Sequence, residues 1–268
     1  MEDLKRATAS FAKLCEIVAQ LRAPGGCPWD REQTNESLLP PLIEEAYEAA
    51  GAIRAKDDAN LREELGDVIL LAVMHAEIAN ETRRFSIEAV LDEVTAKLIR
   101  RHPHVFAKSE VNDAEGVLKQ WEAIKHEEKK GGGGGHYLAG LPAALPALMR
   151  AQKAQKKAAR VNFDWTQLSD VVAKVDEELS ESKEAIAGGD SAEIADEIGD
   201  LLFAVVNLAR KTGLDAEETL QSATEKFVTR FNRVEDELRS QGKRLGDANL
   251  EELDEIWNSL KKTPNAQR

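Results

Sequence analysis

Acidic side chains at helical spacing are the residues in this sequence that most clearly suggest chemistry. Two acids at i and i+3 lie on one face of a helix, about 60° apart around its axis. Two such pairs on facing helices of a hairpin would form a cage of carboxylates. The first set of four consists of Glu45, Glu48, Glu64 and Asp67.

The same arrangement occurs a second time in the other half of the chain. Its members are Glu178, Glu181, Glu197 and Asp200, with the same 16-residue step from the second acid to the third. Acids make up 49 of the 268 residues, so spacing alone is weak evidence for a repeat. The surrounding sequence is stronger evidence, because EELGDVILLAV and DEIGDLLFAVV share an acid pair, a glycine and an apolar run. The chain therefore carries this element twice.

The glycines of this element predict a close approach. Gly66 and Gly199 lie between the third and fourth acids, where glycine costs a helix about 1 kcal/mol relative to alanine. A neighbouring helix or a ligand would explain them. Asp67 and Asp200 lead directly into apolar runs, which places them at the edge of a core, where an unpaired carboxylate is unfavourable. A compensating cation is therefore predicted.

The ligand types favour Mg²⁺, with Mn²⁺ as an alternative. Oxygen donors without thiol or imidazole select hard cations, and Ca²⁺ is disfavoured because the sequence has no EF-hand loop. A di-iron site would need Glu-x-x-His pairs, and none is present. His102 and His104 flank a proline without a third ligand, which argues against zinc. No serine or cysteine nucleophile motif is found, so magnesium-assisted phosphate chemistry is favoured.

Composition limits the partners. The formal net charge of -13 repels phosphate backbones, so neither nucleic acid nor an anionic membrane is expected as a partner. The N-terminus is charged and the apolar runs are too short to span a bilayer. Cys15 and Cys27 have no metal-ligand spacing and are expected to be reduced thiols in a cytoplasmic protein.

Helices must position these acids. No stretch alternates apolar and polar residues for long enough to predict a strand, so the fold class is all-α. Helices are expected over residues 4–21, in the hairpin within 43–78, and over 87–101 and 114–129, and the second half repeats the plan. Ser86 and Ser191 are expected to cap helices. Trp29 lies in a Gly/Pro-rich turn and either fills a core, the favoured reading, or lines a pocket; Trp165 takes the same place in the second half.

A run of five glycines predicts the domain boundary. Gly131 to Gly135 cannot be ordered cheaply, and no GK[ST] follows that would make the run a phosphate loop. We therefore expect a helical domain over 1–130, a linker over 131–140 and a second helical domain over 141–268.

The acid motifs resemble a known family. EEAYE with EELGD, and EELSE with DEIGD, resemble the EExxE…ExxD signature of the MazG family of nucleoside triphosphate pyrophosphohydrolases. GCPWD, RRHPHVF, LPALMRAQK and FDW also resemble two-domain bacterial members, so the likeness covers nearly the whole chain. It implies tandem all-α domains, a homodimer, Mg²⁺ dependence, and hydrolysis of nucleoside triphosphates to monophosphate and pyrophosphate.

The resemblance also implies roles for particular residues. It assigns catalysis and metal binding to Glu178, Glu181, Glu197 and Asp200, and nucleotide contacts to Lys226, Arg230 and Trp257. It places turnover in the C-terminal copy, with Glu45, Glu48, Glu64 and Asp67 as a second metal site. The first copy keeps Lys97, Arg101 and Trp121 as well, so the sequence does not disable it. Trp257 is equally well explained as a core residue of an amphipathic helix.

Three functional hypotheses follow from the acids. In the first, water attacks the α-phosphorus of a nucleoside triphosphate, a glutamate accepts its proton, and pyrophosphate leaves. In the second, the same enzyme class cleaves elsewhere and releases orthophosphate. In the third, the chain is a non-catalytic interaction module whose acidic faces bind a basic partner.

Overall fold

The computed structural model describes residues 2–107 and 136–262, together with residues 113, 116, 117, 120, 121, 124 and 128. Within these residues every regular element is a helix and none is a strand, so the all-α prediction is confirmed. No described helix has the length and apolar character that crossing a membrane requires. The glycine run at 131–135 and most of the helix expected over 114–129 lie outside the described residues.

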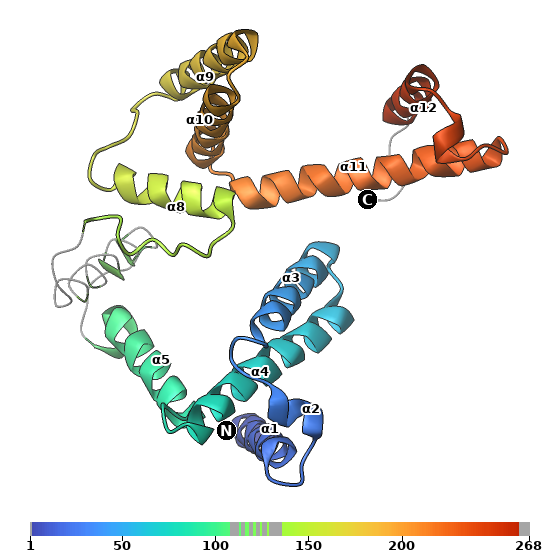
Figure 1. The fold of residues 1–268 in the computed structure, drawn as a ribbon. Coiled ribbons are helices and arrows are strands. Elements are labelled where there is room, and N and C mark those ends of the chain that lie inside the picture. Colours follow the sequence, from blue (N-terminus) through green and yellow to red (C-terminus); the bar gives the residue numbers. More distant parts are fainter. Residues whose placement is uncertain are drawn as a thin grey trace. The chain divides into compact units, whose positions relative to one another are not determined.

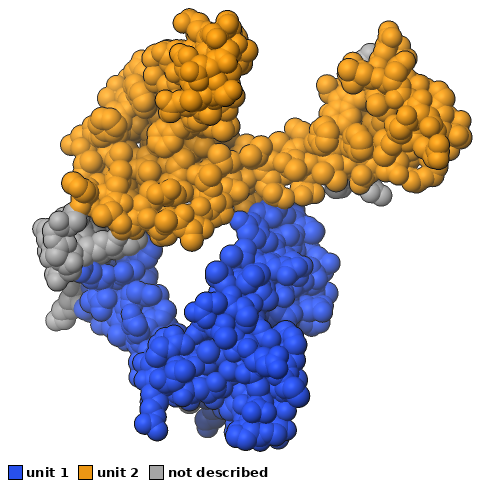
Figure 2. Space-filling model, viewed as in Figure 1, with its two compact units in different colours: residues 1–133 blue, residues 134–268 orange. Residues whose placement is uncertain are grey.

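The chain divides into two compact units, Met1–Gly133 and Gly134–Arg268 (Figure 2). The first unit contains α1 (Glu2–Arg22), α2 (Pro28–Glu32), α3 (Leu39–Ala55), α4 (Asp58–Glu81), α5 (Ile87–Arg101) and α6 (Pro103–Phe106) (Figure 1). α3 and α4 form a hairpin, and α1 packs on α4. Burial of apolar side chains drives this packing. The buried core consists of Val18, Leu38, Leu71, Val73, Met74 and Ile78.

A buried arginine organises the turn that follows α1. Arg22 forms a two-pronged ion pair with Glu81 at the end of α4, with Nε–Oε1 and Nη2–Oε2 distances of 2.6 and 2.8 Å. Its Nη1 donates to the carbonyl oxygens of Asp30 and Gln33. One guanidinium therefore fixes the region of α2 against the end of α4, as the planar donor fork of arginine allows.

The second unit also contains a helical hairpin, but different helices pack against it. Its helices are α8 (Ala147–Ala159), α9 (Leu168–Gly188), α10 (Ser191–Lys211), α11 (Ala216–Ser240) and α12 (Leu250–Lys262), with a short 3-10 turn, η1 (Leu245–Asp247), before α12. α9 and α10 form the hairpin, α8 packs on α10, and α11 contacts α8 near its start and α12 near its end (Figure 1). The α11–α12 contact has its own small core of Val234, Leu238 and Ile256.

The helix caps agree with the sequence in one case and not in another. Ser86 caps α5 as predicted, because its side chain accepts a hydrogen bond from the Ala89 N–H. The prediction for Ser191 was wrong, since Asp190 caps α10 by accepting from the Ala192 N–H. Gly189 ends α9 in the left-handed region, at φ 81°, and Asp190 is then extended, which is the conformation an N-cap residue needs.

The expectation that Trp29 fills a core was also wrong. Pro28 starts the short helix α2, and Trp29 projects from it with 62% of its surface exposed. The space beneath this segment is taken by Arg22, which is only 8% exposed and bonds to the segment's carbonyls. Trp165 of the second unit is 43% exposed and lines a cavity.

Two carboxylate clusters as candidate metal sites

The α9–α10 hairpin brings three of its four predicted acids together. One carboxylate oxygen from each of Glu178, Glu181 and Glu197 lies within 4.8 Å of the other two. Glu178 and Glu181 come from adjacent turns of α9 and Glu197 comes from α10. Glu178 is the most buried of the three, at 5% exposure. Three oxygen donors this close repel one another, which suits a site for a hard divalent cation.

The α3–α4 hairpin builds the same group in the first unit. Oxygens of Glu45, Glu48 and Glu64 also lie within 4.8 Å of one another. Here the most buried acid is on the second helix of the hairpin, because Glu64 of α4 is 8% exposed whereas Glu45 is half-buried and Glu48 is exposed. The two clusters therefore share their residue types and spacing but differ in which acid is removed from water.

The fourth acid of each set is outside these close groups. Asp67 is half-buried, as the sequence predicted, whereas Asp200 is exposed and lines the cavity that Trp165 also lines. Both act on the clusters through their charge, since Asp67 raises the pKa of Glu45 and Asp200 raises the pKa of Glu197. Asp67 and Asp200 therefore lie near the three-acid groups without belonging to them.

The glycines between the acids do not mark a close contact within the chain. A Cβ added at Gly66 or Gly199 would meet no atom within 4 Å among the described residues. The prediction of a neighbouring helix at these positions was therefore wrong for this chain taken alone. The other explanation predicted for these glycines, a bound ligand, stays a prediction, and both glycines are exposed beside the acids.

A lysine neutralises part of the second cluster. Lys174 Nζ lies 2.7 Å from Glu178 Oε1 and 2.7 Å from Glu177 Oε1. Hydrogen bonds with Glu177 and Glu178 raise the pKa of Lys174, so the lysine is charged at neutral pH. Burial, followed by the charges of Glu181 and Glu178, raises the pKa of Glu197. In this cluster, the negative charge of the buried Glu178 is thus compensated by Lys174, one helical turn earlier in α9.

In the first cluster, a hydrogen bond joins two of the acids. Burial and the charge of Glu48 raise the pKa of Glu64, and a hydrogen bond between Glu64 and Glu45 raises it further. Burial also raises the pKa of Glu45, while the hydrogen bond from Glu64 opposes that rise. The hydrogen bond therefore acts in opposite directions on the pKa values of the two carboxyls. At the position that matches Lys174, this unit has Pro41.

A buried serine ties the two helices of the second hairpin together. Ser182 is on the inner face of α9, and its Oγ donates to the Glu178 carbonyl at 2.8 Å and lies 3.3 Å from the Glu197 carbonyl of α10. The matching residue of the first hairpin is Ala49, which is buried but has no hydroxyl. Ser182 thus links the backbone of two cluster acids, which fixes their separation.

The predicted nucleotide contacts form a separate group. The Arg230 guanidinium lies 4.8 Å from the centre of the Trp257 ring, and Phe227 packs on the same ring. Trp257 also joins the core between α11 and α12, and Lys226 is exposed. These side chains belong to the packing of α12 on α11, whereas the acids belong to the α9–α10 hairpin.

Two residues of this region went unnoticed in the sequence. Lys174 could have been found from its i, i+4 spacing to Glu178, which is the spacing of helical ion pairs. Ser182 could have been found by aligning the two hairpins, since it replaces Ala49. Neither is an acid, so neither belongs to the repeated acid motif.

The fold and the clusters together define a class of protein, an all-α chain with two helical hairpins that each hold a carboxylate site. A model of the MazG nucleotide pyrophosphohydrolase domain matches residues 33–106 and 167–235, which contain both clusters. The chain is 44% identical to the nucleoside triphosphate pyrophosphohydrolase of Escherichia coli strain K12, over 93% of this chain and 96% of that one.

Two further comparisons involve Thermotoga maritima. Its nucleoside triphosphate pyrophosphohydrolase/pyrophosphatase MazG is 45% identical, over 96% of this chain and 98% of that one. A crystal structure of a mazG-related protein from the same organism is 34% identical and covers 43% of this chain and 98% of that chain, with a TM-score of 0.38. The family model and the near full-length relatives agree, and the chain belongs to the MazG nucleotide pyrophosphohydrolase family. The resemblance read from its acid motifs is confirmed.

Proposed function

We propose that this chain hydrolyses nucleoside triphosphates to nucleoside monophosphates and pyrophosphate, with turnover in the second unit. The observation that carries the proposal is the cluster of Glu178, Glu181 and Glu197 within 4.8 Å, with a lysine at its edge. Relatives that match nearly the whole chain are named nucleoside triphosphate pyrophosphohydrolases. In domain terms, residues 1–130 form the first domain, 131–140 a linker and 141–268 the catalytic domain.

Mg²⁺, or Mn²⁺ in its place, is the cation we propose for both clusters. The donors are carboxylate oxygens throughout, and the raised pKa of Glu197 and Glu64 reflects burial together with neighbouring negative charge that a cation would relieve. Glu178, Glu181, Glu197 and Asp200 would hold it in the second unit. When bound, it would supply positive charge beside the triphosphate and favour ionisation of a water molecule.

The protein's own side chains would supply the base and the charges that the hydrolysis needs. A glutamate of the cluster accepts the proton of the attacking water, which adds to the α-phosphorus as the bond to pyrophosphate breaks. Lys174 sits beside the cluster and can turn from Glu178 to a phosphate oxygen, because it is a flexible point charge. Lys226 and Arg230 offset the charge of the leaving pyrophosphate, and Trp257 holds the Arg230 guanidinium in place.

A homodimer would bring these two groups together. Arg230 lies about 21 Å along α11 from Ala216, where that helix meets α8, so its own acids are out of its reach. α10 exposes Ile198, Leu202 and Val205 at helical spacing, which gives it an uncovered apolar stripe next to Asp200. We propose that a second copy covers this stripe and supplies its own α11 and α12 to the site.

A product assay tests the proposal. The protein is incubated with each nucleoside triphosphate and Mg²⁺, and the products are separated by ion-exchange chromatography. Monophosphate with pyrophosphate is the expected result. Diphosphate with orthophosphate would exclude attack at the α-phosphorus, and a lack of any product, with or without Mn²⁺, would favour a non-catalytic acidic module.

The setting we propose is the cytoplasm, where nucleoside triphosphates are made and used. Cys15 and Cys27 are both free thiols, which agrees with a reducing compartment.

A further inference from the structure

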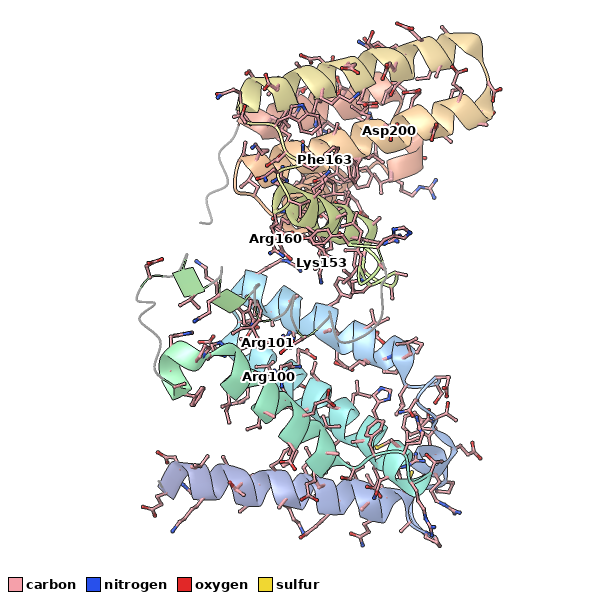
Figure 3. The ribbon with its side chains drawn as sticks, turned by 90° about the vertical axis from the view of Figure 1, so that its left-hand side faces the viewer. Arg100, Arg101, Lys153, Arg160, Phe163 and Asp200 are labelled. Carbon is pink, nitrogen blue, oxygen red and sulfur yellow. The ribbon has the colours of Figure 1, made fainter. Side chains whose placement is uncertain are left out.

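A cavity of about 380 Å³ opens beside the acids of the second unit. It is walled by Phe163 and Trp165 from the segment after α8 and by Phe203 from α10, and Glu178 and Asp200 lie at its acidic side. Phe163 and Asp200 are labelled in Figure 3. Its volume is within the range of about 300 to 1,000 Å³ that small-molecule sites occupy, and its lining combines apolar and aromatic side chains with polar and charged ones.

The polar group of most interest in this lining is Asn207 of α10. It is only 4% exposed, yet its side chain lines the cavity. Its Oδ1 accepts two hydrogen bonds from Arg210, at 2.9 Å from Nε and 2.7 Å from Nη2. Within the part of the chain that the structure describes, its Nδ2 has no hydrogen-bond partner. That donor is therefore available to a group bound in the cavity.

The orientation of this amide is fixed by its neighbours. Arg210 also donates to Asp164 Oδ1, at 2.5 Å, and Lys211 lies 3.3 Å from the other oxygen of Asp164. Exchanging the oxygen and nitrogen of Asn207 would set two N–H donors against the guanidinium, which has donors only. The free Nδ2 therefore remains a donor, and it is held in place by a chain of charged groups that runs to the segment carrying Trp165.

The first unit lacks this arrangement. At the separation that relates Glu45 to Glu178, Asn207 corresponds to Met74, which belongs to the buried core, and Lys174 corresponds to Pro41. The polar lining is thus a property of the second unit, although both units have the acid cluster. A role in metal binding alone would not explain it, because metal binding needs only the acids.

We infer that this cavity holds the base of the nucleoside triphosphate, and that Asn207 Nδ2 donates a hydrogen bond to the oxygen at C6 of a purine or C4 of a pyrimidine, where adenine and cytosine carry an amino group instead. The inference rests on the proposed function, which places the triphosphate on the acids at the edge of the same cavity. Aromatic walls accept the faces of a base by stacking, and a fixed donor selects an acceptor at its edge. The preferred substrates are then nucleotides of keto bases, such as guanine and uracil, over those of adenine and cytosine.

Replacing the amide tests the donor directly. In the Asn207→Asp variant the arginine pair is kept, and an acceptor takes the place of the Nδ2 donor. The ratio of kcat/KM for ATP and CTP to that for GTP and UTP should rise at least tenfold, because the amino bases present a donor. A purely structural role for Asn207 would lower all four values together. Asn249→Asp is the matched control, since it makes the same charge change at the cap of α12, where aspartate caps as well as asparagine.

A second variant separates binding from folding. Asn207→Met copies the first unit and should raise KM for GTP at least tenfold while leaving kcat nearly unchanged, with thermal melts checking that the variant folds. Quenching of tryptophan fluorescence by GMP, measured in the intact protein, should be lost in Trp165→Phe and weakened in Asn207→Met.

The outcomes distinguish this inference from the proposed function. If the wild-type protein releases no pyrophosphate from any nucleotide, the proposed function fails first. If it does so and the four kcat/KM values keep their ratios in Asn207→Asp, the inference is overturned while the activity stands. Unchanged GMP quenching in both Trp165→Phe and Asn207→Met would overturn it as well.

Discussion

The two helical hairpins of this protein hold the same acids but pair them differently. In the first, Glu64 is buried and forms a hydrogen bond with Glu45, and burial with the charge of Glu48 raises the pKa of Glu64. In the second, Glu178 is buried and forms an ion pair with Lys174. A cation bound at the second cluster would therefore compete with a flexible lysine for Glu178.

The residues around the acids differ between the two hairpins. The first has the buried Met74 and Ala49 and the half-buried Pro41 where the second has Asn207, Ser182 and Lys174. The polar residues of the second hairpin contact its cluster or line the adjoining cavity. Both clusters could hold a metal ion, and we propose that the second unit alone binds the substrate productively.

Removing one matched acid from each cluster should produce the largest effect. Glu178→Gln should lower kcat by more than about a hundredfold, the size expected when a group that stabilises the transition state is lost, whereas Glu45→Gln should leave kcat within about twofold. Pyrophosphate release at saturating nucleotide measures both. Loss of turnover in Glu45→Gln alone would reverse our assignment of the active unit.

Lys174→Met should lower kcat/KM for the nucleotide roughly tenfold, or about 1.4 kcal/mol of transition-state binding. Most of the change should be in KM, because the lysine meets the triphosphate by this proposal. The affinity for Mg²⁺ should rise at the same time, since the lysine competes with the cation for Glu178. Lys183→Met is the control, an exposed lysine on the same helix. Parallel weakening of Mg²⁺ and nucleotide binding would contradict this role.

Metal binding should stabilise the protein more at pH 8 than at pH 5. The pKa values of Glu64 and Glu197 are raised above the ordinary value of about 4.3, so ionisation disfavours the folded, metal-free state and stability falls as the pH rises through the raised pKa. Mg²⁺ at a hundred times its Kd should restore about 2.7 kcal/mol per site. Calorimetry with Mg²⁺ and with EDTA measures the difference. Equal shifts at both pH values would show that these carboxyls do not bind the cation.

Ser182→Ala should cost the second unit about 1 kcal/mol, the usual net value of a hydrogen bond, and the first unit nothing. Hydrogen exchange of the α9 and α10 amides should increase, while that of α3 and α4 stays the same. The reciprocal change, Ala49→Ser, tests whether the first hairpin can accept the link. Faster exchange in both hairpins of Ser182→Ala would mean that the two units do not unfold independently.

The smallest effect is expected at the paired glycines. Alanine at Gly66 should stabilise α4 by up to about 1 kcal/mol, because no described residue lies within 4 Å of a Cβ placed there. Alanine at Gly199 should gain the same helix stability but weaken dimer formation, measured by analytical ultracentrifugation, if a second copy covers α10 as proposed. Equal dimer affinity in the two variants would contradict the proposal that a second copy packs against Gly199.

Much of the fold was predictable from local sequence. The period of the apolar residues marked the hairpins and the helix over Ile87–Arg101, and Ser86 marked a cap, because these features depend on residues within one or two turns. The clustering of three acids in each hairpin followed from i, i+3 spacing and a short connection. The capping of α10 was missed by one residue, since a left-handed glycine shifted the cap to Asp190.

What the sequence determined by itself was the set of acids, their repetition and, through its motifs, the family. Only the tertiary structure decided which acid of each cluster is buried, that a lysine pairs with an acid of one cluster whereas a hydrogen bond joins two acids of the other, and that Asn207 has a donor facing a cavity. These depend on contacts between residues far apart in the chain. Burial and pairing of charge arise from that packing, and the residues of a repeated motif do not determine which distant side chains pack around it.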